Sequence, residues 1–270
     1  MKNPTELFKR LVTGAIGISV LVFLVLYPFP VYFSLVVIII TILAAWEYFN
    51  ILFSEKDFGL KVFGTGLSVS ASIGMYAFGH SIFLPLVPAV IFMVFIYALF
   101  CHRDITSASG LIGKTVLGVL YIGLFLSYAI GIRTFENGGW WLLFLFSIIW
   151  MNDTFAFFAG KGFGRTKLAP VISPNKTMEG AAAGLAGGVI TAIVFNTFFL
   201  KELSASTTVL LAVSLGVLCQ LGDLFESMLK RGAGVKDSGS IIPGHGGILD
   251  RIDSIIIPLP FFYYYLIIIG

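Results

Sequence analysis

Charged residues are scarce in this 270-residue chain, where Asp, Glu, Lys and Arg together make up 11% of the sequence. Hydrophobic residues reach 58%, and the mean hydropathy is +0.99. A chain with so little charge cannot cover a globular surface with ionic side chains, which excludes an ordinary soluble protein. The composition therefore predicts an integral membrane protein.

Cysteine and histidine are scarce as well, with two and three residues. A disulfide framework or a structural zinc site needs more ligands at closer spacing. Cys101 and Cys219 each lie near or within an apolar run, so we interpret both as small apolar residues. No cysteine nucleophile or Ser–His–Asp pattern stands out, and any chemistry is expected to rest on carboxylates and cations.

Long apolar runs dominate the chain. A membrane span requires about 20 mostly apolar residues, and nine stretches meet this requirement: 11–29, 31–53, 62–79, 82–101, 115–132, 140–159, 180–200, 206–228 and 252–269. We therefore predict an all-α, polytopic integral membrane protein with about nine transmembrane helices. The single transmembrane domain, 1–270, is expected to combine scaffold spans in 1–135 with catalytic spans and cytoplasmic loops in 136–270.

The positive charges indicate an orientation. If the N-terminus is cytoplasmic, 15 of the 17 Lys and Arg residues fall inside, and only Arg133 and Lys201 fall outside. This bias predicts a multi-pass protein of the cell membrane whose site faces the cytoplasm. A transporter usually places ionisable residues near the midplane, often in repeated halves. Their concentration at one face favours an enzyme over a transporter or lipid scramblase.

The eighth apolar run carries acidic residues near its inner end, in the sequence "QLGDLFESMLK". Gln220, Asp223, Ser227 and Lys230 recur at helical spacing and are expected to share one stripe. A carboxylate at this depth is costly unless it meets a cation or water. Asp223 is therefore a candidate functional residue, and the alternative for Asp223 and Glu226 is a structural ion pair.

A glycine-rich stretch, "IPGHGGILDRID", follows that run. Glycines allow positive φ and close approach of the backbone to a ligand, so Gly246 and Gly247 are expected near an anion. His245 either contacts phosphate or occupies a turn. Asp250 is expected to bind a metal, although an Asp here could also cap the next helix. The role of Asp253 stays open.

A third polar cluster spans the end of the sixth run and the segment after it. Asn152 and Asp153 lie inside the run, where a carboxylate is again costly unless it meets a cation or water. A basic segment with Lys161, Arg165 and Lys167 follows, and then "SPNKTMEG" with Asn175, Lys176 and Glu179. The basic residues could also serve only the positive-inside rule and contact lipid phosphates. Glu47, His80 and His102 are isolated and receive no role.

Carboxylates, cations and glycine-rich loops at one membrane face suit phosphoryl or nucleotidyl transfer. Carboxylates can hold Mg²⁺ and cations can hold phosphates, and such reactions depend mainly on positioning and charge neutralisation. Two other interpretations remain open. One is another membrane transferase that uses nucleotide- or polyprenyl-linked phosphates, and the other is a non-catalytic scaffold.

The stretch from Ser227 to Asp253 resembles the signature of the CDP-diacylglycerol synthases, also called phosphatidate cytidylyltransferases. The resemblance rests on the "SPNKTMEG" element, the nine-span layout and the following residues: Ser227, Lys230-Arg231, Lys236-Asp237, His245-Gly246-Gly247 and Asp250-Arg251-Ile252-Asp253. It implies that CTP and phosphatidate react to give CDP-diacylglycerol and pyrophosphate. It also implies that Mg²⁺ is the cofactor, with a second bound cation possible. The lipid phosphate is expected to attack the α-phosphorus of CTP directly.

The residues and the resemblance together define the expected site. The expected partners are CTP, phosphatidate and membrane lipid, and no nucleic acid is expected to bind. The sequence leaves open whether the chain forms a homodimer. We expect catalytic roles for Asp223, Asp250, Lys176 and Lys236, metal binding by Asp223, Asp250 and Asp153, and substrate binding by Lys167, Asn175, Lys176, Ser227, Lys230, Arg231, Lys236, Asp237, His245, Gly246, Gly247 and Arg251.

Overall fold

The computed structural model describes residues 17, 19–101, 104–239 and 246–269. These residues are almost entirely helical, which confirms the all-α prediction. The main helices are α2 (Pro30–Leu52), α3 (Phe58–Phe78), α4 (Phe83–Cys101), α5 (Ala108–Gly118), α6 (Phe125–Thr134), α7 (Gly138–Phe163), α8 (Met178–Phe195), α9 (Ala205–Gly232), α10 (Leu249–Ile256) and α11 (Pro258–Ile269). Short 3₁₀ segments (Glu55–Asp57, Gly79–Ile82 and Ile105–Ser107), π-helical segments (Val119–Leu124 and Asn196–Leu200) and one two-stranded sheet complete the described elements.

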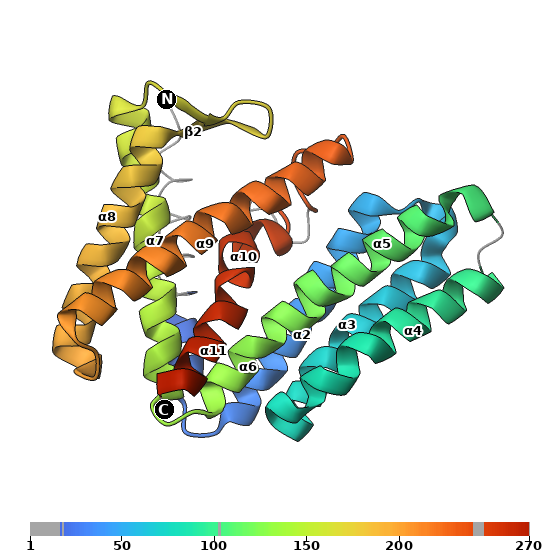
Figure 1. The fold of residues 1–270 in the computed structure, drawn as a ribbon, viewed down its shortest axis with the longest axis horizontal. Helices are drawn as coiled ribbons and strands as arrows, with labels where there is room; N and C mark the ends of the chain where they lie inside the picture. The colour runs from blue at the N-terminus through green and yellow to red at the C-terminus, as the bar shows by residue number, and fades with distance from the viewer. Residues whose placement is uncertain (1–16, 18, 102–103, 240–245, 270) are drawn as a thin grey trace.

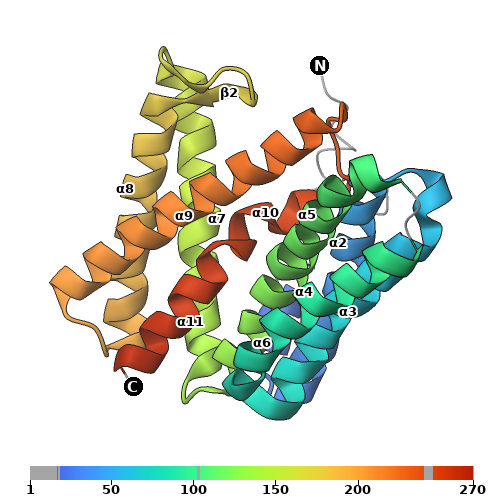
Figure 2. The same ribbon diagram turned by 45° about the vertical axis from the view of Figure 1, so that its right-hand side comes forward.

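The helices form two groups joined by the C-terminal pair. Helices α2 to α6 lie side by side in one group, whereas α7 and α8 pair in the other and α9 crosses them (Figures 1 and 2). Helices α10 and α11 pack between the groups, where α10 contacts α2, α7 and α9. This position allows α10 to receive side chains from both halves of the chain.

Seven stretches of the described residues are long and apolar enough to cross a membrane. The longest, Glu55–Cys101, contains both α3 and α4, which have 21 and 19 residues. The rings of Phe63 and Tyr97 stack at 4.7 Å, so these two helices run antiparallel. Residues 11–16 and 18 of the expected span 11–29 lie outside the described residues, and the count of nine is therefore not confirmed.

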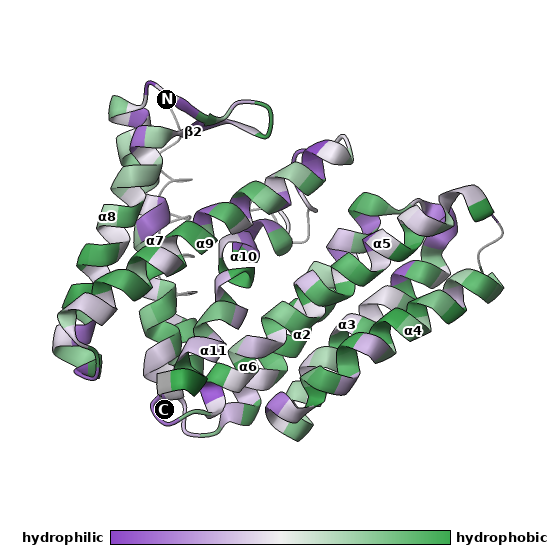
Figure 3. Ribbon diagram, in the orientation of Figure 1, coloured by the Kyte–Doolittle hydropathy of each residue, from purple (hydrophilic) through white to green (hydrophobic). Residues whose placement is uncertain are grey.

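The outward surfaces of the helices agree with a membrane environment. Large apolar side chains such as Phe92, Phe100, Phe198 and Leu210 are exposed on them. Hydrophobic colouring covers most helices, and hydrophilic residues gather at the hairpin and at the C-terminal end of α9 (Figure 3). Because a soluble protein rarely exposes so much contiguous apolar surface, the chain is a multi-pass membrane protein.

Two segments differ from their sequence-based descriptions. The expected span 252–269 consists of α10 and α11, which meet at Ile257, because Pro258 lacks the backbone N–H that would continue one helix. The segment after α7 was expected to be a basic loop. It contains instead an antiparallel hairpin of β1 (Lys167–Ala169) and β2 (Ser173–Thr177). Strands this short carry too few residues to show an alternating pattern.

Helix α8 approaches α7 closely through small residues. A Cβ atom on Gly180 would lie 2.8 Å from the carbonyl oxygen of Ala156, and one on Gly187 would lie 2.5 Å from the Phe155 ring. A Cβ on Gly184 would overlap the Oδ1 atom of Asn152. These three glycines face α7 and set the short distance between the two helices.

Replacing Gly184 should therefore destabilise the protein. We expect Gly184→Ala to lower the free energy of unfolding by about 1–3 kcal/mol, because the buried Asn152 would have to move. Gly66 is a matched control, since a Cβ there meets nothing within 4 Å. Thermal unfolding in detergent should show a lower melting temperature for Gly184→Ala alone, and equal loss in both variants would contradict the packing argument.

Candidate functional site

A cavity of about 780 Å³ lies between α7, α8, α9, α10 and β2. Four carboxylates from three helices line it: Asp153 of α7, Asp223 of α9, and Asp250 and Asp253 of α10. The other lining residues are Ala156, Phe157, Gly160, Lys161, Leu168, Asn175, Lys176, Thr177, Gly180, Ala181 and Gln220. The structure thus gathers residues from all three polar clusters of the sequence around one space.

Lys176 of β2 forms an ion pair with Asp223 on one side of this cavity. The side chains are 26% and 31% exposed, so both remain accessible from the cavity. Ser227, one helical turn after Asp223, reaches its Oδ1 atom only at 3.5 Å. Asp153 and Asp253 line the same cavity as Asp223. The hairpin thereby supplies a cation where three carboxylates converge.

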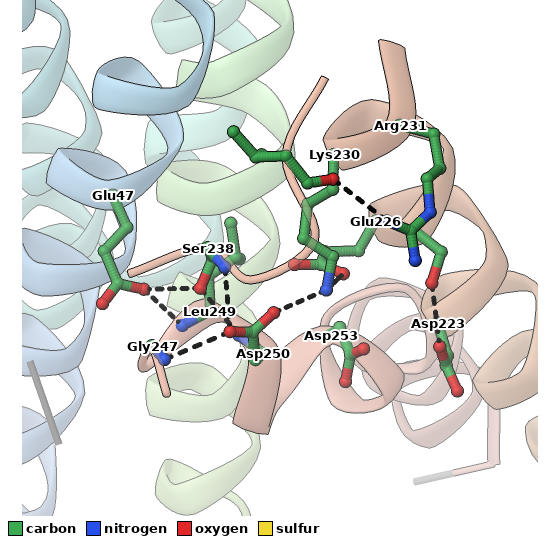
Figure 4. A network of polar contacts seen from close by, with 12 residues as sticks. Glu47, Asp223, Glu226, Lys230, Arg231, Ser238, Gly247, Leu249, Asp250 and Asp253 are labelled. Atoms are coloured by element: carbon green, nitrogen blue, oxygen red, sulfur yellow. Dashed lines mark hydrogen bonds and ion pairs between the residues drawn. The ribbon is translucent and has the colours of Figure 1, made fainter. Parts of the chain in front are cut away.

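A second cation, Lys230 of α9, lies between Glu226 and Asp250 (Figure 4). Its Nζ atom is 2.5 Å from Glu226 Oε2 and 2.5 Å from Asp250 Oδ1. The three side chains are only 12%, 1% and 14% exposed, in the order Lys230, Glu226 and Asp250. Glu226 therefore takes part in the ion pair that was the structural alternative, and Lys230 holds one oxygen of Asp250.

The other oxygen of Asp250 binds the backbone of the preceding loop. Asp250 Oδ2 accepts hydrogen bonds from Ser238 N at 2.9 Å and from Gly247 N at 3.1 Å. Gly246 has φ 81°, and a Cβ on Gly247 would overlap the Oγ atom of Ser238. Gly246 thus has the positive φ that was expected, whereas the Gly247 N–H contacts a carboxylate of the chain itself.

Glu47 of α2 is part of the same network, although the sequence analysis gave it no role. It is 2% exposed and accepts hydrogen bonds from Ser238 Oγ at 3.0 Å, Ile248 N at 3.0 Å and Leu249 N at 2.9 Å. A single carboxylate inside an apolar run was a usable signal, because such residues are rare without a function. Ser238, the residue that joins Glu47 to Asp250, had no comparable signal.

Asn152 and Gln220 brace the helices that carry Asp153 and Asp223. The amide of Asn152 donates to Gly216 O at 3.0 Å, and Gln220 Nε2 donates to Asn152 Oδ1 at 3.0 Å and to Ala181 O at 2.9 Å. These hydrogen bonds connect α7, α8 and α9. Since Asn152 is fully buried, the network fixes the backbone on which the cavity carboxylates stand.

Glu179, in the first turn of α8, contacts the two residues just before β1 and is not part of the cavity lining. Its carboxylate accepts hydrogen bonds from the backbone N–H groups of Arg165 at 3.0 Å and Thr166 at 3.1 Å. Thr177, the N-cap residue of α8, accepts a hydrogen bond from Gly180 N. Both contacts set the angle at which the hairpin, with Asn175 and Lys176, leaves the helix.

Several expected substrate-binding residues lie outside the lining of this cavity. Arg231 donates to the carbonyl oxygen of Val235 at 3.2 Å at the exposed end of α9. His245 lies outside the described residues. Four more are exposed in β1, the loop after α9 and α10: Lys167, Lys236, Asp237 and Arg251. Ser227, Lys230, Gly246 and Gly247 are likewise absent from the lining. Lys161, in contrast, lines the cavity although it was absent from the expected site.

The carboxylates suit a hard cation by their chemistry, because Mg²⁺ prefers oxygen ligands. All three residues expected to bind a metal, Asp153, Asp223 and Asp250, line the cavity. Within the described ranges, however, no three acidic, His or Cys side chains are arranged to hold a metal ion together. Lys176 and Lys230 supply the compensating charge for Asp223 and Asp250 here.

The fold and the cavity define a polytopic membrane protein with an acidic and basic site between its helices. Residues 8–269 match the Cytidylyltransferase family, and the chain belongs to this family. The family expected from the signature is thereby confirmed. The match covers both groups of helices, so it includes the scaffold half as well as the cavity.

Three similar proteins share one name. A phosphatidate cytidylyltransferase of Synechocystis is 32% identical over 98% of this chain and 97% of its own length. The enzyme of that name from Bacillus subtilis is 43% identical over 57% of this chain and 58% of its own length. One from Haemophilus influenzae is 43% identical over 48% and 46%. The chain thus aligns with about half the length of the last two relatives.

Proposed function

We propose that this protein is a phosphatidate cytidylyltransferase, which converts CTP and phosphatidate to CDP-diacylglycerol and pyrophosphate. The observation that carries the proposal is the cavity in which Asp223 and Asp250 meet Lys161 and Lys176. Membership of the Cytidylyltransferase family and similarity to phosphatidate cytidylyltransferases support it. Phosphoryl-type transfers require this combination of charge neutralisation and positioning more than a covalent catalyst.

The cavity suits a nucleotide and a lipid head group together. Its volume of about 780 Å³ lies within the usual range of small-molecule sites. Ala156, Phe157 and Leu168 give it an apolar wall beside the charged one. Phe157 is 62% exposed and belongs to a predicted membrane span. An acyl chain could therefore remain in the hydrocarbon while its phosphate reaches the lysines.

In the proposed reaction, a non-bridging oxygen of the phosphatidate phosphate attacks the α-phosphorus of CTP. The bond from that phosphorus to the oxygen of the β-phosphate breaks, and pyrophosphate leaves. Lys161 and Lys176 reduce the repulsion between the two anionic substrates. Lys230 holds Asp250 in one orientation. Because the attacking oxygen is already ionised near neutral pH, the step needs no strong general base.

In this proposal Asp223 and Asp250, with Asp153 behind them, would hold one or two Mg²⁺ ions. The ion would neutralise charge on the triphosphate when bound. Exposed cations near the same site add positive potential that attracts a polyanionic nucleotide. They are Lys167, Arg231, Lys236 and Arg251. Asn175 and Ser227 remain proposed substrate contacts, as do Asp237, His245 and the glycines that follow it.

We further propose that the N-terminus and the site face the cytoplasm. The support is the charge tally, in which 15 of 17 Lys and Arg residues fall on one side of nine expected spans. CTP is a soluble, charged substrate, so its site must open to an aqueous compartment. This arrangement places the membrane-bound and the soluble substrate at one interface.

The activity can be tested with the full chain in detergent, phosphatidate and CTP labelled at the α-phosphate. We expect label to enter the lipid fraction only when Mg²⁺ is present, with one pyrophosphate released per lipid labelled. Other phosphorylated lipids in place of phosphatidate distinguish a different membrane transferase. Absence of Mg²⁺-dependent labelling would refute the proposed function, and a trapped cytidylyl-protein would refute the direct attack.

A further inference from the structure

Glu47 connects the N-terminal half of the chain to the loop that carries Asp250. The carboxylate lies in the last two turns of α2, is 2% exposed, and accepts three hydrogen bonds from residues about 200 positions later. Figure 4 shows it beside Ser238 and Leu249, on the opposite side of Asp250 from Lys230. This contact crosses the expected division between scaffold spans and catalytic spans.

The contacts of Glu47 compensate a buried charge without a salt bridge among the described residues. An ionised carboxylate away from water is costly unless several donors face it. Ile248 is the N-cap residue of α10 and Leu249 is its first residue, so two of the donors are N–H groups at a helix N-terminus. These groups lack partners within their own helix and favour negative charge.

The loop is built closely around this carboxylate. A Cβ atom on Gly239 would lie 2.6 Å from Glu47 Oε1, and one on Gly247 would lie 2.5 Å from Glu47 Oε2. Only residues without a side chain allow the backbone to approach so near. Gly239 and Gly247 therefore leave the space that the Glu47 carboxylate occupies.

Ser238 transmits the contact to Asp250. Its Oγ atom donates to Glu47 Oε2 at 3.0 Å and accepts a hydrogen bond from Asp250 N at 3.3 Å. Its backbone N–H donates to Asp250 Oδ2 at 2.9 Å. Glu47 is thus separated from the cavity carboxylate by one residue, which contacts both the backbone and the side chain of Asp250.

We propose that Glu47 is a positioning residue that holds Asp250 for the transfer reaction. The proposal rests on the proposed function, because it assigns a use to the orientation of Asp250. Lys230 fixes Asp250 from the α9 side, and Glu47 fixes it from the α2 side through Ser238. The N-terminal half then contributes directly to the geometry of the site.

The test compares Glu47→Gln with Thr41→Ala in the purified full-length protein. The glutamine keeps the shape, but its NH₂ group must face at least one of the three donors. Thr41 is a matched control, because it is fully buried in α2 and its hydroxyl group contacts Ser72 rather than the loop. We expect Glu47→Gln to lower kcat by about 10–100-fold, as supporting residues of a site typically do, and Thr41→Ala to change it less than about twofold.

Three further readouts separate positioning from stability. Amide hydrogen exchange at Ile248 and Leu249 should be faster in Glu47→Gln than in Thr41→Ala. The Mg²⁺ concentration for half-maximal activity should rise in Glu47→Gln. The double variant with Ser238→Ala should be no slower than Glu47→Gln alone, because both changes interrupt one path. If Glu47→Gln does not fold, Ser238→Ala by itself should still lower kcat by about fivefold or more.

Each outcome has a definite meaning. Unchanged amide exchange would refute the contact itself. Faster exchange with an unchanged kcat and Mg²⁺ requirement would make Glu47 a stabilising clamp and refute the positioning role, as would additive effects in the double variant. If the unaltered protein transfers no cytidylyl group, the proposed function fails separately, and the kinetic role of Glu47 fails with it. Exchange at Ile248 and Leu249 would then still decide whether Glu47 orders the loop.

Discussion

Asp223→Asn is expected to lower kcat for cytidylyl transfer by about 10²–10³-fold, the usual cost of removing one preorganised electrostatic group. Asp223 reaches the cavity from α9 and pairs with Lys176 of the hairpin. An asparagine has nearly the same shape, but it can neither balance the charge of that lysine nor bind Mg²⁺ as a carboxylate does. The loss should therefore come from charge and not from packing.

A matched control is Glu202→Gln, which makes the same chemical change at an exposed residue before α9. Glu202 accepts a hydrogen bond from Asn137 at 3.0 Å and lies outside the cavity lining. We expect kcat to stay within about twofold of the unaltered protein, as for most surface changes. The measurement is Mg²⁺-dependent labelling of lipid by CTP at saturating substrates. Near-equal rates for both variants would show that Asp223 takes no part in the reaction.

Lys230→Met should produce the largest loss of stability in the site. Lys230 is the cation between Glu226 and Asp250 at 2.5 Å from each, and Glu226 is 1% exposed. Glu226 Oε1 has no hydrogen-bond partner among the described residues, so this carboxylate depends on Lys230. Removing one partner of a buried ion pair leaves an uncompensated charge, which costs about 3–5 kcal/mol. Thermal unfolding in detergent should therefore begin at a much lower temperature.

A second substitution distinguishes this cause from lost packing. The double variant Lys230→Met with Glu226→Gln should recover part of the melting temperature, because the stranded charge is gone. Activity should not recover, since Asp250 still lacks the cation that orients it. Lys56→Met, at an exposed lysine, should leave the melting temperature nearly unchanged. If the double variant were no more stable than Lys230→Met, the charge argument would be wrong.

The fold class and the family could be predicted from the sequence because both depend on local information. Apolar runs of span length determine where membrane helices form. The spacing from Ser227 to Asp253 is specific enough to indicate the family, and the family match over residues 8–269 confirmed it. Helical periodicity also placed Asp223 and Lys230 correctly within one continuous helix, α9.

The partners of each charged residue could not be predicted in this way. Spacing along α9 suggested that Asp223 and Lys230 belong to one stripe, yet Asp223 pairs with Lys176 and Lys230 pairs with Asp250. The hairpin that presents Lys176 and Asn175 was expected to be a loop. Glu47 received no role because it is the only charged residue in its apolar run.

By itself the sequence determined that the chain is a helical membrane protein and that it carries the signature of one family. These properties follow from hydrophobic length and from residues close together in the chain. Only the tertiary structure decided which carboxylates share a cavity, which lysine balances each of them, and that α2 supplies Glu47 to a loop about 200 residues later. Such contacts depend on how helices pack, and helix packing brings together residues that no local pattern connects.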